Sequence, residues 1–279
     1  MSYNRSNLTF GFTKNEENTD KFPSEVKALE VYAFNTEGIY AANFKIANIN
    51  HGTTPFTMPI SLPLGEYTFV VWGGTMNTYT IKSNKTGKEL EIGTSNFTEA
   101  QLAIKQQGTV IDYPLDDLYY GRADHVNLTQ QELGTHFNLT KNTHLLNITL
   151  RGVDAPHTDV SCTASNGQFN FDNSLSESAS MIQYKPFERK ETTEELVAKF
   201  SILRLLSDSD CRLKVRNTAT NEELYNENLV EQILKLPNIN SDDDLDRHGN
   251  YNIVISINPY VGVTVSINGY IVTESGHDI

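Results

Sequence analysis

Residues 65–74 read GEYTFVVWGG and contain the only tryptophan of the chain. Between Tyr67 and Trp72, residue types that favour β-strands occupy both alternating positions. A strand with bulky residues on both faces is normally covered on both faces, so this stretch predicts a central, buried strand. Gly65 before it and the pair Gly73–Gly74 after it can adopt the positive φ angles that tight turns need.

Short runs of alternating apolar and polar residues, separated by turn residues, continue on both sides of this strand. Residues 27–40 predict one hairpin, and Asn268-Gly269 predicts another because both residues accept positive φ angles. Capping residues and apolar spacing predict two short helices, at 98–108 and 226–237. Strands without regular helical crossovers between them predict an all-β fold made of antiparallel sandwiches.

The chain length predicts two domains. About nine to twelve strands fit two sandwiches better than one. The best boundary is RGVDAPHTDV at residues 151–160, where Gly, Asp and Pro interrupt the strand pattern. We therefore expect an N-terminal β-sandwich domain at 1–152 and a C-terminal β-sandwich domain at 153–279.

Composition and motifs exclude several classes of function. A formal net charge of −13 without clusters of Lys or Arg argues against nucleic-acid binding. The chain lacks a G-x-S-x-G elbow, a phosphate-binding glycine loop, a CxxC pair and paired histidines at metal-ligand spacing. We therefore predict no enzymatic activity, no cofactor and no metal ion.

Two acidic stretches have both a structural and a functional interpretation. Residues 241–250, SDDDLDRHGN, offer carboxylates to a calcium ion, but the glycine comes late and no glutamate closes the loop. A solvated turn is the preferred interpretation there. Residues 111–121, IDYPLDDLYYG, could supply paired catalytic carboxylates, but the proline and the tyrosines favour a structured loop.

The chain has two cysteines, Cys162 and Cys211. Each shares its strand parity with apolar neighbours, so both side chains are expected to point inward. A disulfide between them would fit an extracytoplasmic protein, whereas two separate buried thiols are the alternative. Both interpretations stay open because a sequence fixes no distance between the two residues.

Several segments, taken in chain order, form a recognisable set. They are TFGFTKNEENTDKFPSEVKALEVYAFNTEGIY (9–40), LPLGEYTFVVWGG (62–74), DDLYYG (116–121), LTKNTHLLNITLRG (139–152), AKFSILRL (198–205), LDRHGNYNIVI (245–255) and SINGYIV (266–272). Together they resemble the FimB-type fimbrial anchor family of Bacteroidales, which tethers type V pili to the outer membrane. The resemblance covers nearly the whole chain.

This resemblance implies two transthyretin-like β-sandwich domains, no catalysis, and fimbrillin subunits as partners. It also implies an extracytoplasmic position at the surface of the outer membrane, held by a lipid on a cysteine near the mature N-terminus. The first cysteine of this sequence is Cys162. The lipid-carrying cysteine is therefore expected upstream of these residues.

The family resemblance further implies that subunits join by strand exchange, and sheet edges can accept such strands. Two groups of residues are candidates: Leu8, Phe10 and Phe12 in the first strand, and Val265, Ile267, Tyr270 and Val272 in the terminal hairpin. Both groups could equally be ordinary paired strands. Related stalk subunits are cut by an Arg-directed protease after the first strand, and no arginine lies between Arg5 and Arg122. That fits an anchor that keeps its first strand.

A basal pilus anchor is the preferred prediction, with two alternatives. One is a tip or accessory fimbrillin of the same system. The other is a carbohydrate-binding β-sandwich lipoprotein, in which exposed Tyr119 and Tyr120 stack on sugars and an acidic loop binds calcium.

Overall fold

The computed structural model describes residues 3–52, 55–105, 108–129, 134–193 and 195–276. The chain divides into two units, each built from three segments. The first unit comprises Met1–Lys105, Asp116–Asn142 and Gln168–Glu177, and the second comprises Gln106–Leu115, Thr143–Gly167 and Ser178–Ile279. Each unit therefore contains a short segment from the other half of the sequence. A single domain boundary near residue 153 does not describe this division.

Strand β12 (Thr143–Arg151) shows most clearly how the observed division differs from the predicted domain boundary. It precedes the expected boundary, yet it pairs with β17 (Glu195–Leu203) and β20 (Asn250–Asn258) of the second unit. Its main-chain hydrogen bonds therefore belong to the second unit.

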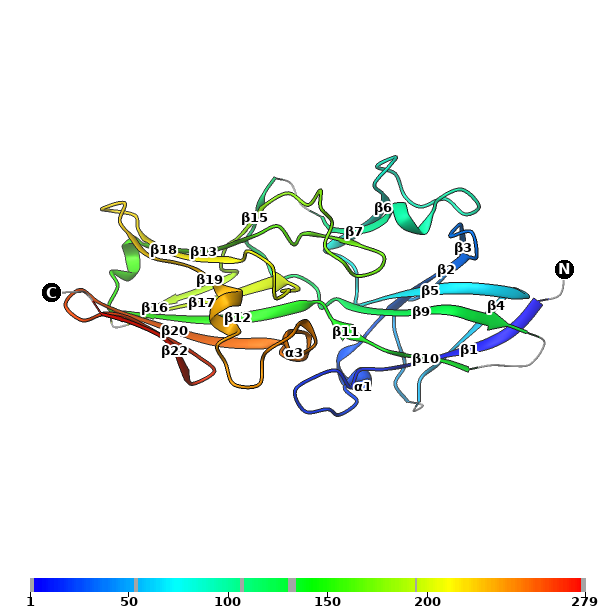
Figure 1. Ribbon diagram of the computed structural model, residues 1–279, viewed down its shortest axis with the longest axis horizontal. Helices are drawn as coiled ribbons and strands as arrows, with labels where there is room; N and C mark the ends of the chain where they lie inside the picture. The colour runs from blue at the N-terminus through cyan, green and yellow to red at the C-terminus, as the bar shows by residue number, and fades with distance from the viewer. Residues whose placement is uncertain (1–2, 53–54, 106–107, 130–133, 194, 277–279) are drawn as a thin grey trace. The chain divides into compact units, whose positions relative to one another are not determined.

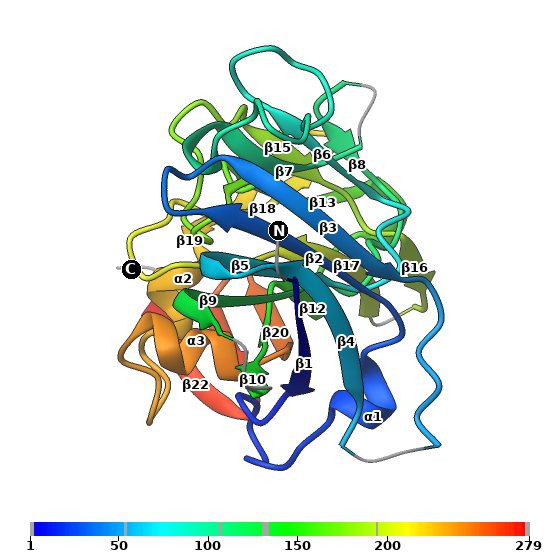
Figure 2. The same cartoon turned by 90° about the vertical axis from the view of Figure 1, so that its right-hand side faces the viewer.

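The first unit has three layers (Figures 1 and 2). Its middle sheet has the order β11 (Thr140–Lys141), β9 (Tyr119–Leu128), β5 (Gly65–Gly73), β2 (Leu29–Asn35) and β3 (Tyr40–Ile46). One face is covered by β10 (Gly134–Asn138), β1 (Tyr3–Gly11) and β4 (Thr57–Pro63), with the helix α1 (Phe22–Glu25). The other face is covered by β14 (Gln168–Asn170), β7 (Ala100–Ile104) and β6 (Tyr79–Ser83).

The central position of β5 explains its sequence. Phe69 and Val71 belong to the hydrophobic cluster shared with β1 and β4, and Trp72 faces the opposite layer. The Trp72 ring lies 5.0 Å from the Tyr120 ring and 5.9 Å from the Phe171 ring, centroid to centroid. The predicted central strand, buried on both faces, is confirmed. Gly74 has φ +116, and a Cβ atom there would lie 2.0 Å from the carbonyl oxygen of Asp117, so only glycine fits.

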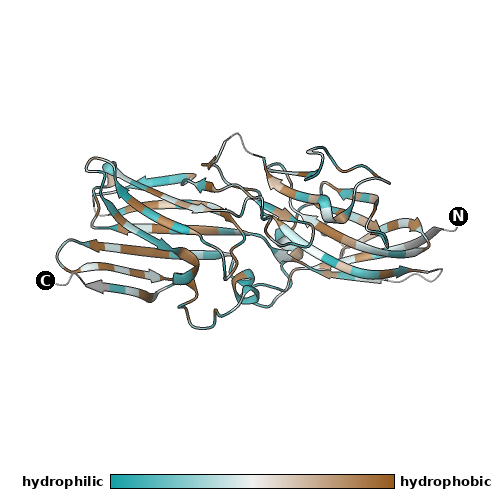
Figure 3. Cartoon of the chain, turned by 45° about the horizontal axis from the view of Figure 1, so that its top comes forward, coloured by the Kyte–Doolittle hydropathy of each residue, from teal (hydrophilic) through white to brown (hydrophobic). Residues whose placement is uncertain are grey.

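The second unit has two sheets (Figure 1). A six-stranded sheet has the order β16 (Glu188–Glu191), β17, β12, β20, β21 (Gly262–Ile267) and β22 (Tyr270–Gly276). A five-stranded sheet has the order β19 (Glu223–Asn228), β18 (Arg212–Asn217), β13 (Thr158–Ala164), β15 (Ile182–Tyr184) and β8 (Val110–Ile111). Hydrophobic and hydrophilic residues alternate along these strands (Figure 3), as expected for sheets with one buried face.

Helices are few and short. Helix α2 (Leu229–Ile233) contacts β19 and β22, and helix α3 (Asp242–Arg247) precedes β20. The helix predicted at 226–237 is confirmed in this shorter form, with Asn228 as its N-cap. No helix in the described parts of the chain is long and apolar enough to cross a membrane.

The helix predicted at 98–108 is wrong. Asn96 caps a single 3₁₀ turn, η1 (Phe97–Glu99), and strand β7 follows directly. Ala100, Leu102 and Ile104 alternate into the core, which is the periodicity of a strand. A second 3₁₀ turn, η2 (Ala155–His157), leads into β13.

The all-β fold with layered sheets is confirmed, and so are the two predicted hairpins, β2–β3 and β21–β22. Most strand pairs are antiparallel. Among the described strands, three pairs are parallel: β1 with β10, β12 with β20, and β8 with β15. Side-chain alternation is the same in both kinds of pair, so the sequence pattern could not distinguish them.

Candidate functional site

The terminal strand β22 forms an outer edge of the six-stranded sheet, and among the described residues it pairs only with β21. The turn between them is Asn268-Gly269, with φ angles of 50° and 85°. An edge strand presents main-chain N–H and C=O groups that have no strand partner on one side. This edge can therefore accept a strand from another protein.

Side chains of the terminal hairpin divide between core and surface. Val265 and Ile267 of β21 are buried, so these two candidate residues are part of the core. Tyr270 and Ile271 of β22 are 56% and 63% exposed. Val272 is half-buried and forms a bulge, because Val265 pairs with Thr273 while Ser266 pairs with Ile271.

The opposite edge of the same sheet has a different chemistry. Strand β16 reads ERKE, and all four of its charged residues are exposed. Charged side chains on an edge strand prevent pairing with another sheet. Strand β22 instead presents Tyr270 and Ile271, so the sheet has one protected edge and one unprotected edge.

Strand β22 is also fixed in place by helix α2. The Thr273 hydroxyl donates a hydrogen bond of 2.6 Å to Gln232 Oε1, and the Lys235 ammonium donates one of 3.3 Å to the Thr273 hydroxyl. Gln232 is itself buried. These contacts keep β22 on its own sheet.

The first strand, β1, is internal to its sheet. It lies between β10, which is parallel to it, and β4, which is antiparallel. Leu8, Phe10 and Phe12 are buried, and the Phe10 ring lies 5.5 Å from the Phe137 ring. The structure therefore places Leu8 and Phe10 in a core strand and Phe12 in the core directly after that strand. They lie in the first unit, whereas the terminal hairpin lies in the second.

The two cysteines meet in the core of the second unit. Cys162 Sγ and Cys211 Sγ lie 3.0 Å apart, and both residues are fully buried free thiols. The hydrogen bond with Cys162, together with burial, raises the pKa of the Cys211 thiol. Neither thiol is accessible as a nucleophile. A disulfide between them stays a prediction.

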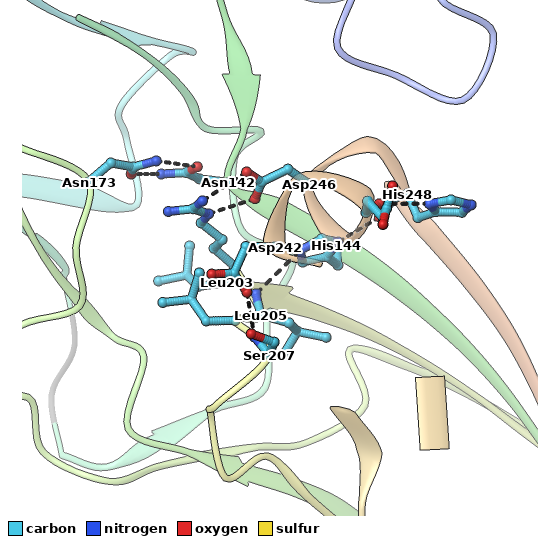
Figure 4. Close-up of polar contacts among 12 residues, drawn as sticks. Asn142, His144, Asn173, Leu203, Leu205, Ser207, Asp242, Asp246 and His248 are labelled. Carbon is cyan, nitrogen blue, oxygen red and sulfur yellow. Dashed lines mark hydrogen bonds and ion pairs between the residues drawn. The ribbon is translucent and has the colours of Figure 1, made fainter. Parts of the chain in front are cut away.

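The acidic stretch at 241–250 contains the capped helix α3 and does not form the solvated turn expected from the sequence (Figure 4). Ser241 accepts a hydrogen bond from the Asp244 N–H and begins helix α3. Asp246 is 3% exposed and forms two hydrogen bonds with Arg204, of 2.6 and 2.8 Å. Asp242 accepts a 2.6 Å hydrogen bond from the Ser207 N–H.

The carboxylates of this helix thus bind its own chain. The pKa of Asp244 is lowered, first by the hydrogen bond from the Asn240 N–H and then by the Ser241 hydroxyl. Among the described residues, no group of three or more His, Cys, Asp or Glu side chains could hold a metal ion. The calcium-binding alternative therefore has no assembled site here.

The tyrosines of DDLYYG are buried, which contradicts their predicted exposure. Tyr119 is fully buried and donates a 3.0 Å hydrogen bond to Glu25 Oε2. Tyr120 is 8% exposed and donates a 2.9 Å hydrogen bond to the carbonyl of Phe171. Because β9 begins at Tyr119, both rings pack within the first unit and cannot stack on a sugar.

Sequence analysis missed the exposed apolar residues near the terminal strands. Ile271 is one, and Tyr260 and Val261 in the β20–β21 turn are 85% and 67% exposed. The signal for Ile271 was present in Tyr270-Ile271-Val272, because alternation cannot place three consecutive bulky residues on one buried face. Tyr260 and Val261 had no such signal.

Comparison with known proteins gives consistent matches over most or nearly all of the chain. The model of the family described as fimbrillin-A associated anchor proteins Mfa1 and Mfa2 matches residues 4–276. The minor fimbrium anchoring subunit Mfa2 of Porphyromonas gingivalis is 26% identical over 269 residues, covering 90% of this chain and 80% of that protein.

Two solved structures share the fold. The fimbrial anchor protein Mfa2 from Porphyromonas gingivalis matches with a TM-score of 0.85 at 23% identity, covering 98% of this chain and 100% of that one. A Bacteroides thetaiotaomicron protein, solved as a candidate polysaccharide-binding protein (DUF1812), matches with a TM-score of 0.85 at 24% identity, covering 98% and 99%.

Proposed function

Because the chain belongs to the family of fimbrillin-A associated anchor proteins Mfa1 and Mfa2, we propose that it is the basal anchor subunit of a fimbria. In this role it holds the fimbria at the cell surface by pairing one of its sheet edges with a fimbrial subunit. The family match favours this role over that of a tip or accessory fimbrillin. The role needs no catalysis, and we expect none.

The observation that supports strand pairing most directly is the contrast between the two edges of the six-stranded sheet. Strand β16 is charged throughout, whereas β22 presents Tyr270 and Ile271 to solvent. A strand laid against β22 would gain main-chain hydrogen bonds and would cover these two side chains. Since β22 is bonded to α2 through Thr273, it acts as the receiving edge.

The partner strand should carry apolar residues at the two consecutive positions that pair with Tyr270 and Ile271, one on each face of the sheet. Main-chain hydrogen bonds supply affinity in this mode of binding, and the side chains that face Tyr270 and Ile271 supply selectivity. We infer that the partner is a fimbrillin subunit. Attachment to the outer membrane through a lipid on an upstream cysteine completes the proposed role.

Charging the open edge tests the proposal. We expect the Tyr270→Lys/Ile271→Glu variant to bind isolated fimbriae at least roughly tenfold more weakly, because partner binding would have to desolvate both charges. Binding is measured by sedimentation of the purified protein with fimbriae from the source bacterium. Both side chains are more than half exposed, so circular dichroism and thermal unfolding should be unchanged.

Lys190→Glu is the matched control. It changes an exposed charge on β16, the opposite edge of the same sheet, and should bind like the wild type. Wild-type affinity in the Tyr270→Lys/Ile271→Glu variant would refute β22 as the docking edge.

A further inference from the structure

A polar cavity of about 400 Å³ opens in the first unit, beside the edge strand β3. Its walls come from β2 and β3 of the middle sheet, from β6, and from the chain segments that flank β6 and β7. This volume lies within the range of about 300–1,000 Å³ that is typical of small-molecule sites. The terminal hairpin proposed above as the docking edge belongs to the other unit, so the cavity is a separate feature.

Glu30 on β2 is the central polar group of this cavity. Its side chain is only 15% exposed, and it accepts a 2.9 Å hydrogen bond from the Asn43 amide. The Lys45 ammonium lies 3.5 Å from the other carboxylate oxygen. The Tyr32 hydroxyl on β2 also forms a hydrogen bond with Glu30. A carboxylate has about four lone-pair sites, so Glu30 can still accept a hydrogen bond from a ligand.

Tyr40 on β3 contributes a hydroxyl group without a hydrogen-bond partner among the described residues. The residue is only 6% exposed. Burial, and after it the negative charge of Glu30, raises the pKa of Tyr40 to about 12. The hydroxyl therefore stays protonated at neutral pH and can both donate and accept a hydrogen bond. Because Tyr40 lines the cavity, a ligand bound there can supply a hydrogen-bond partner for this hydroxyl.

The rim of the cavity contains a strained residue. Met76 has φ +59, in the left-handed region that a long side chain such as methionine rarely adopts. Five of the seven described non-glycine residues with positive φ are asparagines, for which this conformation costs little. Strain of this kind concentrates at binding sites. Met76, Ile81 and Leu90 give the cavity an apolar wall beside its polar groups.

The charges around the cavity indicate which ligand it fits. Glu30 and Glu89 are balanced by Lys45 and Lys105, so neither a strongly anionic nor a strongly cationic ligand is favoured. A metal ion would need a larger cluster of carboxylate or imidazole ligands than the described residues provide. A neutral ligand with many hydroxyl groups fits, because each hydroxyl can donate to a carboxylate and accept from an ammonium, an amide or a phenol.

We propose that this cavity binds one unit of a neutral saccharide. Glu30 and Tyr40 form the hydrogen bonds that select sugar hydroxyls, Asn43 and Lys45 orient the Glu30 carboxylate, and Met76 contacts the carbon–hydrogen face of the ring. Such a saccharide can come from a host glycoconjugate or from a bacterial capsule. Both sources present the same hydroxyl chemistry to the cavity.

The test uses the intact chain on an array that carries neutral mammalian oligosaccharides and neutral bacterial polysaccharides in separate arms. Hits are then titrated by isothermal calorimetry with the soluble glycan. We expect binding in at least one arm, and the responding arm identifies the source. Glu30→Gln removes the charge and Tyr40→Phe removes only the hydroxyl, and each should weaken binding roughly tenfold or more.

Glu66→Gln is the matched control, because Glu66 is a partly exposed carboxylate outside this cavity that pairs with His125 at 2.8 Å. It should bind the glycan like the wild type. Tyr40→Phe deletes a single atom without a described hydrogen bond, so it keeps the test valid if Glu30→Gln does not fold. The proposal fails if the wild type binds no neutral glycan, or if both cavity variants bind as well as the wild type. All cavity variants should bind fimbriae normally. The glycan-binding test and the fimbria-binding test of β22 can therefore fail independently of each other.

Discussion

Replacing Asp246 by alanine should lower the free energy of unfolding of the second unit by about 3–5 kcal/mol. The Asp246 side chain is 2% exposed and the Arg204 side chain 13% exposed, and two hydrogen bonds join them. Without the carboxylate, the Arg204 guanidinium would remain largely buried with a major counter-ion removed. Helix α3 would also lose one of its attachments to the chain that follows β17, while the contact between Asp242 and Ser207 would remain (Figure 4). Urea unfolding followed by circular dichroism measures this change.

Two further variants test whether the loss of stability comes from the broken ion pair or whether any substitution in this region would cause it. Arg204→Met/Asp246→Leu replaces both charges by apolar groups of similar size and should be far less destabilising than Asp246→Ala, because no buried charge is left unpaired. Asp243→Ala changes an exposed carboxylate of the same helix and should have little effect. If Asp246→Ala lowers the free energy of unfolding by less than about 1 kcal/mol, the pair with Arg204 does not hold α3 in place.

Oxidation of the cysteine pair should raise the free energy of unfolding by an amount similar to the loss caused by Asp246→Ala. We predict that Cys162 and Cys211 form a disulfide after export, when an extracytoplasmic thiol oxidant accepts the two electrons and two protons are released. The bond would close a loop between residues 49 positions apart. Loop closure of this length restricts the unfolded chain enough to stabilise the fold by about 3–4 kcal/mol, so reduction should lower the melting temperature.

Mass spectrometry and thermal unfolding of exported protein check this prediction. The oxidised chain should be lighter by two hydrogen atoms and should melt higher than the same sample treated with a reductant. Cys211→Ala is the control, since its melting temperature should not depend on the reductant. Two titratable thiols per unfolded chain, from protein exported without a reductant, would contradict the disulfide.

The parts of the fold that the sequence predicted are those fixed by local chemistry. Tyr67 to Trp72 identified β5 because strand-forming residues on both faces have few alternatives. Asn268-Gly269 identified the terminal turn because few other residue pairs accept its φ angles. The resemblance to fimbrial anchors was also correct, since it used segments distributed along nearly the whole chain.

The parts that sequence analysis missed depend on contacts between distant segments. Gln168–Glu177 joins the first unit and Gln106–Leu115 joins the second, and no local pattern reveals such an exchange. The helix predicted at 98–108 failed for a related reason. The observed cap is Asn96, which precedes the predicted range and begins only one 3₁₀ turn. Pairing with β6 and β14 then makes Ala100–Ile104 a strand.

In the candidate sites, too, local sequence predicts some features and contacts between distant segments determine the others. The terminal hairpin was predicted as an edge, but only the sheet order shows that β22 is the outer strand and that β21 is covered. Glu30 and Tyr40 appear in the sequence as ordinary hairpin residues. Their importance comes from β6 and the segments beside it, which enclose a cavity over one face of that hairpin.

The most direct test of the anchor role is the location of fimbriae in a strain of the source bacterium that lacks this chain. Cells and culture medium are separated, and the fimbrial subunits in each fraction are measured by immunoblotting. If the chain is the basal anchor, the fimbriae should still assemble but should appear mainly in the medium, and expression of the wild-type chain should return them to the cells. Fimbriae that stay attached to cells without the chain would contradict the account.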